Sequence, residues 1–202
     1  MQKLRLLSSV IALFITVSAF ADDPQQPAPA PQPKAGAYLG VQGGLSNQSG
    51  QNPVFTTASS HLMQGYTDAL NNGFDLGFHV GYHYNDFRLE GEFAHMQNDI
   101  ADIGGQNWNT NLIMFNSYYD FDIGAPWGPY LGAGLGLAIF PSAISNYSAQ
   151  PSNCEFAYQG MMGLQYHVSS TFALFADYTY IGYTNLKGNH SNLFNVGMNY
   201  FF

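Results

Sequence analysis

Two short segments place a histidine beside a serine, the pair that many hydrolytic enzymes use as base and nucleophile. They are His190-Ser191 and His167-Val168-Ser169. A serine becomes a nucleophile when a histidine takes its proton and a carboxylate orients that histidine. No Asp or Glu follows His190 in the chain, and His167 lies where a strand is predicted to end in a short turn. Neither pair therefore predicts a catalytic site, and we expect the protein not to be an enzyme.

A larger group of ionisable side chains shares the polar faces of alternating segments: Asp75, His79, His83, Arg88, Glu90, Glu92, Asp120, His167 and Asp177. His79 and His83 are four residues apart, which along a strand separates them by about 13 Å, too far to bind one metal ion. Cys154 is the only cysteine, so an intrachain disulfide and a thiol-rich metal site are excluded. We expect neither a metal nor a cofactor.

The elements that must position these side chains are strands, because the dominant period of the chain is two from Gly36 onward. From Phe74 to Asn85, apolar residues alternate with Asp, His, Asn and Gly. Successive strand side chains point to opposite faces, so one face is apolar and the other is polar or glycine. The same alternation marks seven further segments: 37–45, 87–94, 113–121, 131–139, 156–167, 172–180 and 194–202. The sequence predicts an all-β fold, an eight-stranded antiparallel transmembrane β-barrel.

The composition favours a membrane barrel over a soluble β-sandwich built from the same strands. Only 9% of the residues are charged, whereas 16% are aromatic. The polar faces of a sandwich meet water and usually carry Lys and Glu, but these faces carry Gly, Asn, Gln, His and carboxylates with a single Arg. The apolar faces carry no Lys or Arg, as expected where either residue costs about 2–4 kcal/mol at mid-membrane.

The first residues predict export. Lys3 and Arg5 precede an apolar stretch from Leu6 to Val17, and Ala19-Phe20-Ala21 follows, so residues 1–21 are predicted to be a cleaved signal peptide. The Pro-rich residues 22–35 are predicted to be an extended periplasmic segment, and residues 36–202 the barrel. After residue 21, three basic residues face thirteen acidic ones, a net charge of −10. This charge argues against nucleic acid as a partner.

The connections between the predicted strands alternate in length. The short ones are Asn85-Asp86, Gly124 to Gly128 and Val168 to Ser170. The long ones run from Ser46 to Asn72, Asn98 to Asn107, Pro141 to Asn153 and Gly182 to Ser191. In outer-membrane barrels the short turns face the periplasm and the long loops face outward. We therefore predict a bacterial outer-membrane protein with both termini in the periplasm.

Four segments resemble a known family in their order and spacing: YLGVQGGLS (38–46), FRLEGEF (87–93), GPYLGAGLGL (128–137) and FNVGMNYFF (194–202). They resemble the small eight-stranded surface-antigen barrels of the opacity-protein and OmpA-like superfamily, and the likeness covers residues 36–202. The resemblance implies that the last strand carries a signal for the outer-membrane insertion machinery, formed by Val196, Met198, Tyr200 and Phe202. It also implies a surface antigen, an adhesin or a structural envelope protein in contact with outer-membrane lipid and lipopolysaccharide.

The interior residues allow two interpretations of the lumen, a plug or a pore. An eight-stranded bore is just filled by side chains, so Arg88, Glu90, Glu92, Asp120 and Asp177 predict a polar network that plugs the lumen. One Arg cannot neutralise all these carboxylates, so some must be protonated or the lumen must hold water. A hydrated lumen would form a narrow, cation-preferring pore.

The remaining alternatives concern the outer rim. Some small outer-membrane barrels deacylate lipid A with a Ser, a His and a carboxylate near this rim, and His190-Ser191 is the pair that such an enzyme would use here.

The predicted outer loops are rich in Asn, Ser, Gln and Gly, as in residues 46–52. Exposed loops on a rigid scaffold commonly carry binding function. We expect these loops to bind a host or matrix ligand.

Overall fold

The computed structural model describes residues 35–49, 70–100, 107–140, 154–184 and 190–202. All eight predicted strands are present: β1 (Ala35–Ser49), β2 (Leu70–Tyr84), β3 (Phe87–Ile100), β4 (Asn107–Asp120), β5 (Trp127–Ile139), β6 (Cys154–His167), β7 (Phe172–Tyr183) and β8 (His190–Phe201). None of the described residues forms a helix of the length and apolarity needed to cross a membrane. The predicted signal peptide 1–21, residues 22–34 and much of each long connection lie outside the described residues.

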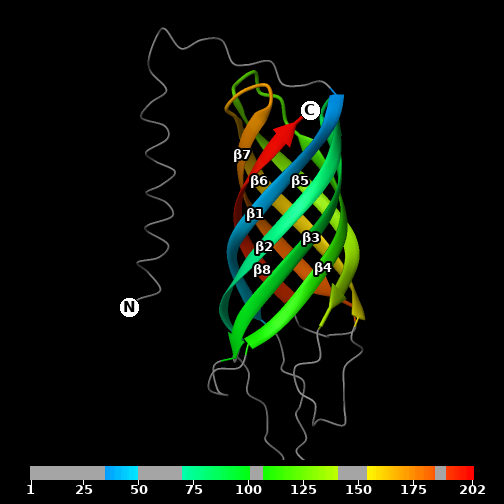
Figure 1. Ribbon diagram of the computed structural model, residues 1–202, viewed down its shortest axis with the longest axis vertical. Coiled ribbons are helices and arrows are strands. Elements are labelled where there is room, and N and C mark those ends of the chain that lie inside the picture. The colour runs from blue at the N-terminus through cyan, green and yellow to red at the C-terminus, as the bar shows by residue number, and fades with distance from the viewer. Residues whose placement is uncertain (1–34, 50–69, 101–106, 141–153, 185–189) are drawn as a thin grey trace, which may run out of the picture.

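The eight strands form one closed antiparallel barrel, as predicted (Figure 1). Each strand pairs with its neighbours in sequence, and β8 pairs with β1, so the sheet has no open edge. Following paired residues once around the barrel leads from Tyr38 to Gln48 of the same strand, a stagger of ten residues. A stagger of this size tilts the strands by about 40° from the barrel axis and fixes the width of the bore.

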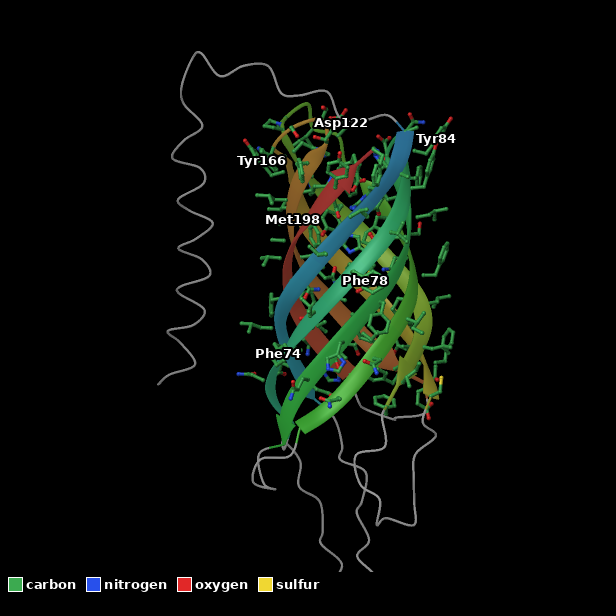
Figure 2. The ribbon with its side chains drawn as sticks, in the orientation of Figure 1. Phe74, Phe78, Tyr84, Asp122, Tyr166 and Met198 are labelled. Carbon is green, nitrogen blue, oxygen red and sulfur yellow. The ribbon has the colours of Figure 1, made fainter. Side chains whose placement is uncertain are left out.

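Outward side chains form an apolar band around the barrel. Phe78 and Met198 project from its middle and Phe74 from nearer one end (Figure 2). The side chains of Leu76 and Val196 are 65% and 63% exposed, which places large apolar surface in contact with the surroundings. On β2 the band runs from Phe74 to Tyr84, a rise of about 25 Å for a tilted strand, which matches the apolar band of outer-membrane barrels.

The two ends of the band differ. At one end, outward aromatic side chains form a girdle: Tyr84, Phe87, Tyr119, Phe121, Trp127, Tyr166, Phe172, Tyr200 and Phe202. At the other end, the outward residues become polar and bond to each other across strands. Asn47 donates to Asn72 (2.9 Å), and His95 lies 2.7 Å from Asn111. The apolar surface is therefore bounded on both sides by groups suited to a membrane interface.

The girdle end carries the short turns, together with the start of β1 and the end of β8 (Figure 1). We call it the short-turn end and the opposite one the loop end. Asn85 adopts the left-handed conformation (φ 52°) that a two-residue hairpin turn requires. The connection between β4 and β5 spans residues 121–126, not Gly124 to Gly128 as predicted, because Trp127 and Gly128 already pair with β6.

The short turns are predicted to face the periplasm, and epitope tags test this orientation. A tag inserted between Asn85 and Asp86 should bind antibody only after the cells are permeabilised. A tag between Gly104 and Gly105, in the predicted outer loop, should bind antibody on intact cells. Labelling of the Asn85 tag on intact cells would reverse the orientation.

The terminal aromatic gives a second prediction. Phe202 points outward, is 72% exposed, and its backbone N–H donates to the Ala37 carbonyl (3.0 Å). Phe202→Ser should slow membrane insertion but leave export unchanged, because the insertion machinery is expected to bind this side chain. Heat-modifiable mobility on gels measures the folded fraction. Phe87→Ser is the matched control, since Phe87 is an outward girdle residue on another strand. If both variants slow membrane insertion equally, Phe202 has no special role in insertion.

Candidate functional site

The lumen is filled because large inward side chains lie over glycines of the neighbouring strands. A Cβ added to any of four glycines would lie 2.4–2.6 Å from the facing aromatic ring. The pairs are Tyr38 with Gly81, Tyr118 with Gly132, Tyr130 with Gly163, and Phe175 with Gly197. This packing explains Gly132 of the GPYLGAGLGL segment, whereas Gly134 lies against Asn116 and Gly136 against Met114, and all three contacts fill the bore with side chains.

An apolar cluster closes the lumen toward the loop end. Its members come from β3 to β8 and the residue after β5, and each is at most 5% exposed: Ala94, Met96, Leu112, Met114, Ala138, Phe140, Ala157, Ile181, Tyr183 and Leu193. The rings of Phe140 and Tyr183 are 5.9 Å apart in a T-shaped contact. The sequence analysis did not predict this cluster, because it treated the inward faces as polar along their whole length.

A second cluster closes the lumen at the short-turn end. Tyr38, Ala173 and Phe201 are buried together, and the rings of Tyr38 and Phe201 are 5.3 Å apart. His83 and His167 flank the Phe201 ring at 6.2 and 5.8 Å. The polar groups around Glu90, Glu92 and Asp177 thus lie between two apolar clusters.

An ion pair between neighbouring strands lies next to this second cluster. Arg88 of β3 donates two hydrogen bonds to Asp120 of β4, at 2.8 and 2.9 Å. Its guanidinium carbon also lies 4.6 and 4.9 Å from the ring centroids of Tyr118 and Tyr130. A bidentate pair flanked by aromatic faces is a strong arrangement for a buried Arg. Three carboxylates, those of Glu90, Glu92 and Asp120, were candidate partners of Arg88. Within the described residues, Arg88 forms an ion pair with Asp120 and with neither glutamate.

Neutral donors stabilise the two glutamates instead. The Tyr38 hydroxyl donates to Glu90 (2.8 Å), as does the Tyr118 hydroxyl (3.1 Å). Glu92 accepts hydrogen bonds from three side-chain amides: Gln42 at 2.9 Å, Asn116 at 2.7 Å and Gln159 at 2.9 Å. The sequence analysis expected protonated carboxyls or water to solve the charge imbalance. The structure adds a third solution, because phenol and amide donors replace water around these carboxylates.

Asp177 lies opposite these groups on β7, where it accepts hydrogen bonds from Tyr130 (2.8 Å) and Thr179 (3.2 Å). The space between Asp177, Arg88 and Glu90 amounts to about 10 Å³, and its lining also includes Gln42, His79 and Asn199. A volume of this size holds about one water molecule. The structure therefore brings all five predicted lumen residues into one enclosed network, although through partners that the sequence did not specify.

The structure does not bring either Ser–His pair together. His190 points outward and stacks on Tyr180 at 5.4 Å, whereas Ser191 points inward and bonds to Tyr183 at 2.9 Å. Adjacent residues of a strand face opposite sides, so this separation follows from the strand itself. His167 points inward and lies 2.9 Å from Gln165.

Ser169 has a structural role in the turn between β6 and β7, because its hydroxyl oxygen accepts the backbone N–H of Phe172 at 3.0 Å. In the ranges that the structure describes, no group of three or more His, Cys, Asp or Glu side chains is arranged to hold a metal ion.

A closed barrel with an apolar outer band, an aromatic girdle and a filled polar lumen defines the class of outer-membrane β-barrels. Comparison with known proteins gives the family. Residues 9–202 match the family described as "Outer membrane protein beta-barrel domain", and the chain belongs to this family.

Individual relatives agree with this assignment. The outer membrane protein PagN of Salmonella typhimurium is 27% identical in an alignment 191 residues long. The match covers 78% of this chain and 79% of PagN. Neisserial surface protein A has a similar structure, with a TM-score of 0.62 and 22% identity over 83% of this chain and 99% of its own. OprG of Pseudomonas aeruginosa follows at a TM-score of 0.52 and 16% identity, over 85% and 98% of the two chains. These two structures share the fold, and the match to the family model confirms the predicted resemblance to small outer-membrane barrels.

The Arg88–Asp120 ion pair yields a stability prediction. Arg88→Ala leaves Asp120, whose side chain is 18% exposed, without its counter-charge, so the loss should be smaller than the loss of about 3–5 kcal/mol that is typical of a fully buried pair. Asp120→Ala should be similarly destabilising, and the double variant should lose less than the sum of the two. Urea unfolding of the refolded protein in detergent measures all four forms. Asp122→Ala, in an exposed turn, is the control. Strictly additive losses would show that the two side chains do not interact.

Proposed function

We propose that the protein is a surface antigen or adhesin, whose rigid barrel presents its long connections at the cell surface for binding a host or matrix ligand. The filled lumen is the observation that carries this proposal. Apolar clusters close both ends of the polar network, and the network itself encloses space for about one water. A barrel of this kind supports transport poorly, so its functional surface lies outside the bore.

The composition of the predicted outer loops supports a binding role. The connection after β1 begins with Gly50-Gln51-Asn52, and the connection at 141–153 contains Ser, Asn, Gln and Tyr with no charged residue. Uncharged polar side chains on exposed loops offer hydrogen-bond donors and acceptors to a partner without a strong charge requirement. Neisserial surface protein A, which shares the fold, is a surface protein by its name.

The proposal also holds that the protein is neither an enzyme nor a pore. The outward His190 and the inward Ser191 cannot exchange a proton in this arrangement. The cation-preferring pore has one observation in its favour, the excess of carboxylates in the bore, but amide and phenol groups satisfy several of these carboxylates. A pore would require the packed side chains to move aside.

Replacing residues 50–69 and 141–153 with Gly-Ser linkers of equal length tests the binding role. The variant should fold normally, because the strand pairing and the lumen are unchanged. Bacteria that express it should adhere to cultured epithelial cells and to immobilised matrix extract at least tenfold less than bacteria with the parent protein. A Gly-Ser linker inserted between Asn85 and Asp86 is the control and should leave adherence unchanged.

Planar-bilayer recordings of the refolded parent protein separate the remaining possibilities. Adherence that depends on the loops, together with silent bilayers, supports the proposal. Discrete cation-selective conductance would favour the pore. Equal adherence of parent, loop variant and a strain that lacks the protein would favour a structural role in the envelope.

A further inference from the structure

Four buried polar side chains form a line of hydrogen bonds across the lumen. His79 Nε2 lies 2.7 Å from Asn199 Oδ1, and the Asn199 amide nitrogen donates to Gln165 Oε1 at 3.3 Å. At the far end of the line, Gln165 Nε2 lies 2.9 Å from His167 Nε2. Each of the four residues is at most 6% exposed. The line joins β2, β8 and β6, and no two of these strands are neighbours in the barrel.

The strand register and two small residues make room for this line. Around the barrel, His79 pairs with Gly40, Gly40 with Asn199, Asn199 with Ala173, and Ala173 with His167. Large and small residues therefore alternate along one row. A Cβ on Gly40 would collide with the side chains of His79 and Asn199 where they meet. Gly40 is thus the residue that lets β2 and β8 bond to each other over β1.

The direction of donation along the line is set by Glu90. His79 Nε2 faces Glu90 Oε2 at 3.8 Å as well as the Asn199 oxygen. A ring nitrogen that faces a carboxylate carries a proton, because the other tautomer would turn a lone pair toward the negative charge. Asn199 therefore accepts from His79 and has its nitrogen left for Gln165. Gln165 accepts in turn and donates from its nitrogen to His167.

His167 is then an acceptor at Nε2, so it is neutral and carries its proton on Nδ1. This Nδ1 has no hydrogen-bond partner among the described residues, so the arrangement is held by the bond from Gln165. A proton on Nε2 would place two donors face to face. The Gln165 amide would have to turn, and its nitrogen would then face the nitrogen of Asn199, which breaks the longest bond of the line.

Ionisable groups from three strands act on the two histidines of the line. On His167 they are Asp120 of β4, which attracts a proton, and His83 of β2 and Arg88 of β3, which oppose one. On His79 they are Glu90 and Glu92 of β3. The histidine beside the glutamates thus fixes the direction of the line, and the histidine at the other end is the one that responds to an added proton.

We propose that His167 is a proton-operated latch of the barrel. In the neutral state it ties β6 to β8 and β2 through the line of hydrogen bonds, and with a proton on Nε2 it releases β6 from Asn199. His167 is the last residue of β6 and lies at the short-turn end. The protons that open the latch therefore come from the side that is predicted to face the periplasm. This role is separate from ligand binding by the long connections.

The pH dependence of stability tests the latch. Histidine in an unfolded chain takes up a proton near about pH 6.5, whereas the closed latch keeps His167 neutral. The unfolded state therefore binds more protons, so the stability that the latch contributes is present above this pH and is lost as the pH falls. Urea unfolding of the refolded full chain in detergent gives the folding equilibrium constant. Between about pH 7.5 and about pH 5.5 it should fall up to about tenfold more for the parent than for His167→Gln.

Two features of the variants make this comparison specific. Glutamine at position 167 offers an acceptor oxygen to Gln165 but does not titrate, so it keeps the line and removes the proton site. His95→Gln is the matched control, because His95 is an outward histidine of the loop end that bonds to Asn111 instead. This control should keep the pH dependence of the parent.

Nitrogen NMR of the parent keeps the test decisive if His167→Gln does not fold. In ¹⁵N-labelled protein at neutral pH, His167 should be the Nδ1–H tautomer and His79 the Nε2–H tautomer. On acidification, the side-chain amide signals of Gln165 and Asn199 should shift together with the titration of His167. An Nε2–H tautomer of His167 at neutral pH, or equal pH dependence of the parent and His167→Gln, would overturn the latch.

Discussion

The structure depends on one constraint: inside a hydrocarbon layer every backbone N–H and C=O group must be bonded within the protein. A sheet meets this constraint only when its last strand pairs with its first. Here β8 lies against β1 from Tyr38↔Phe201 to Ser49↔His190, and Phe202 still donates to Ala37 beyond the last strand residue. The number of strands and the stagger of ten residues together set the strand tilt and the diameter of the bore, whatever the interior side chains are.

A bore of fixed size must be filled, and the chain fills it with aromatic rings over glycines and with carboxylates bonded to neutral donors. Asn116 shows how closely these groups depend on each other. Its nitrogen donates to Glu92 at 2.7 Å, while its oxygen accepts from Gln159, which also donates to Glu92. Because each donor serves a fixed acceptor, loss of one group leaves another buried without a partner, which typically costs about 1–3 kcal/mol. The lumen therefore rigidifies the barrel.

The sequence predicted the strands, their number and the face of each side chain, because a period of two depends only on local geometry. It could not predict which interior groups meet, because that depends on the stagger around the whole barrel. Arg88, Glu90 and Glu92 share one strand face, yet only Arg88 lies level with Asp120, while Glu92 meets Gln159 of the distant β6. The apolar cluster was missed for the same reason: Met96 and Leu112 come from the paired strands β3 and β4, and Ile181 of β7 joins them only when the barrel closes.

The strands and the connections between them contribute differently to stability, and this difference limits where a functional surface can lie. The interactions that hold the barrel together are strand pairing, the lumen network and contact with lipid, and they involve residues of the strands and those directly next to the strand ends. Lengthening a connection between strands costs little free energy, about 0.6 kcal/mol for each doubling of loop length. Connections such as residues 50–69 can therefore change in sequence and length without affecting Arg88, Glu92 or the closure of β8 on β1. The connections can diversify while the same barrel is retained.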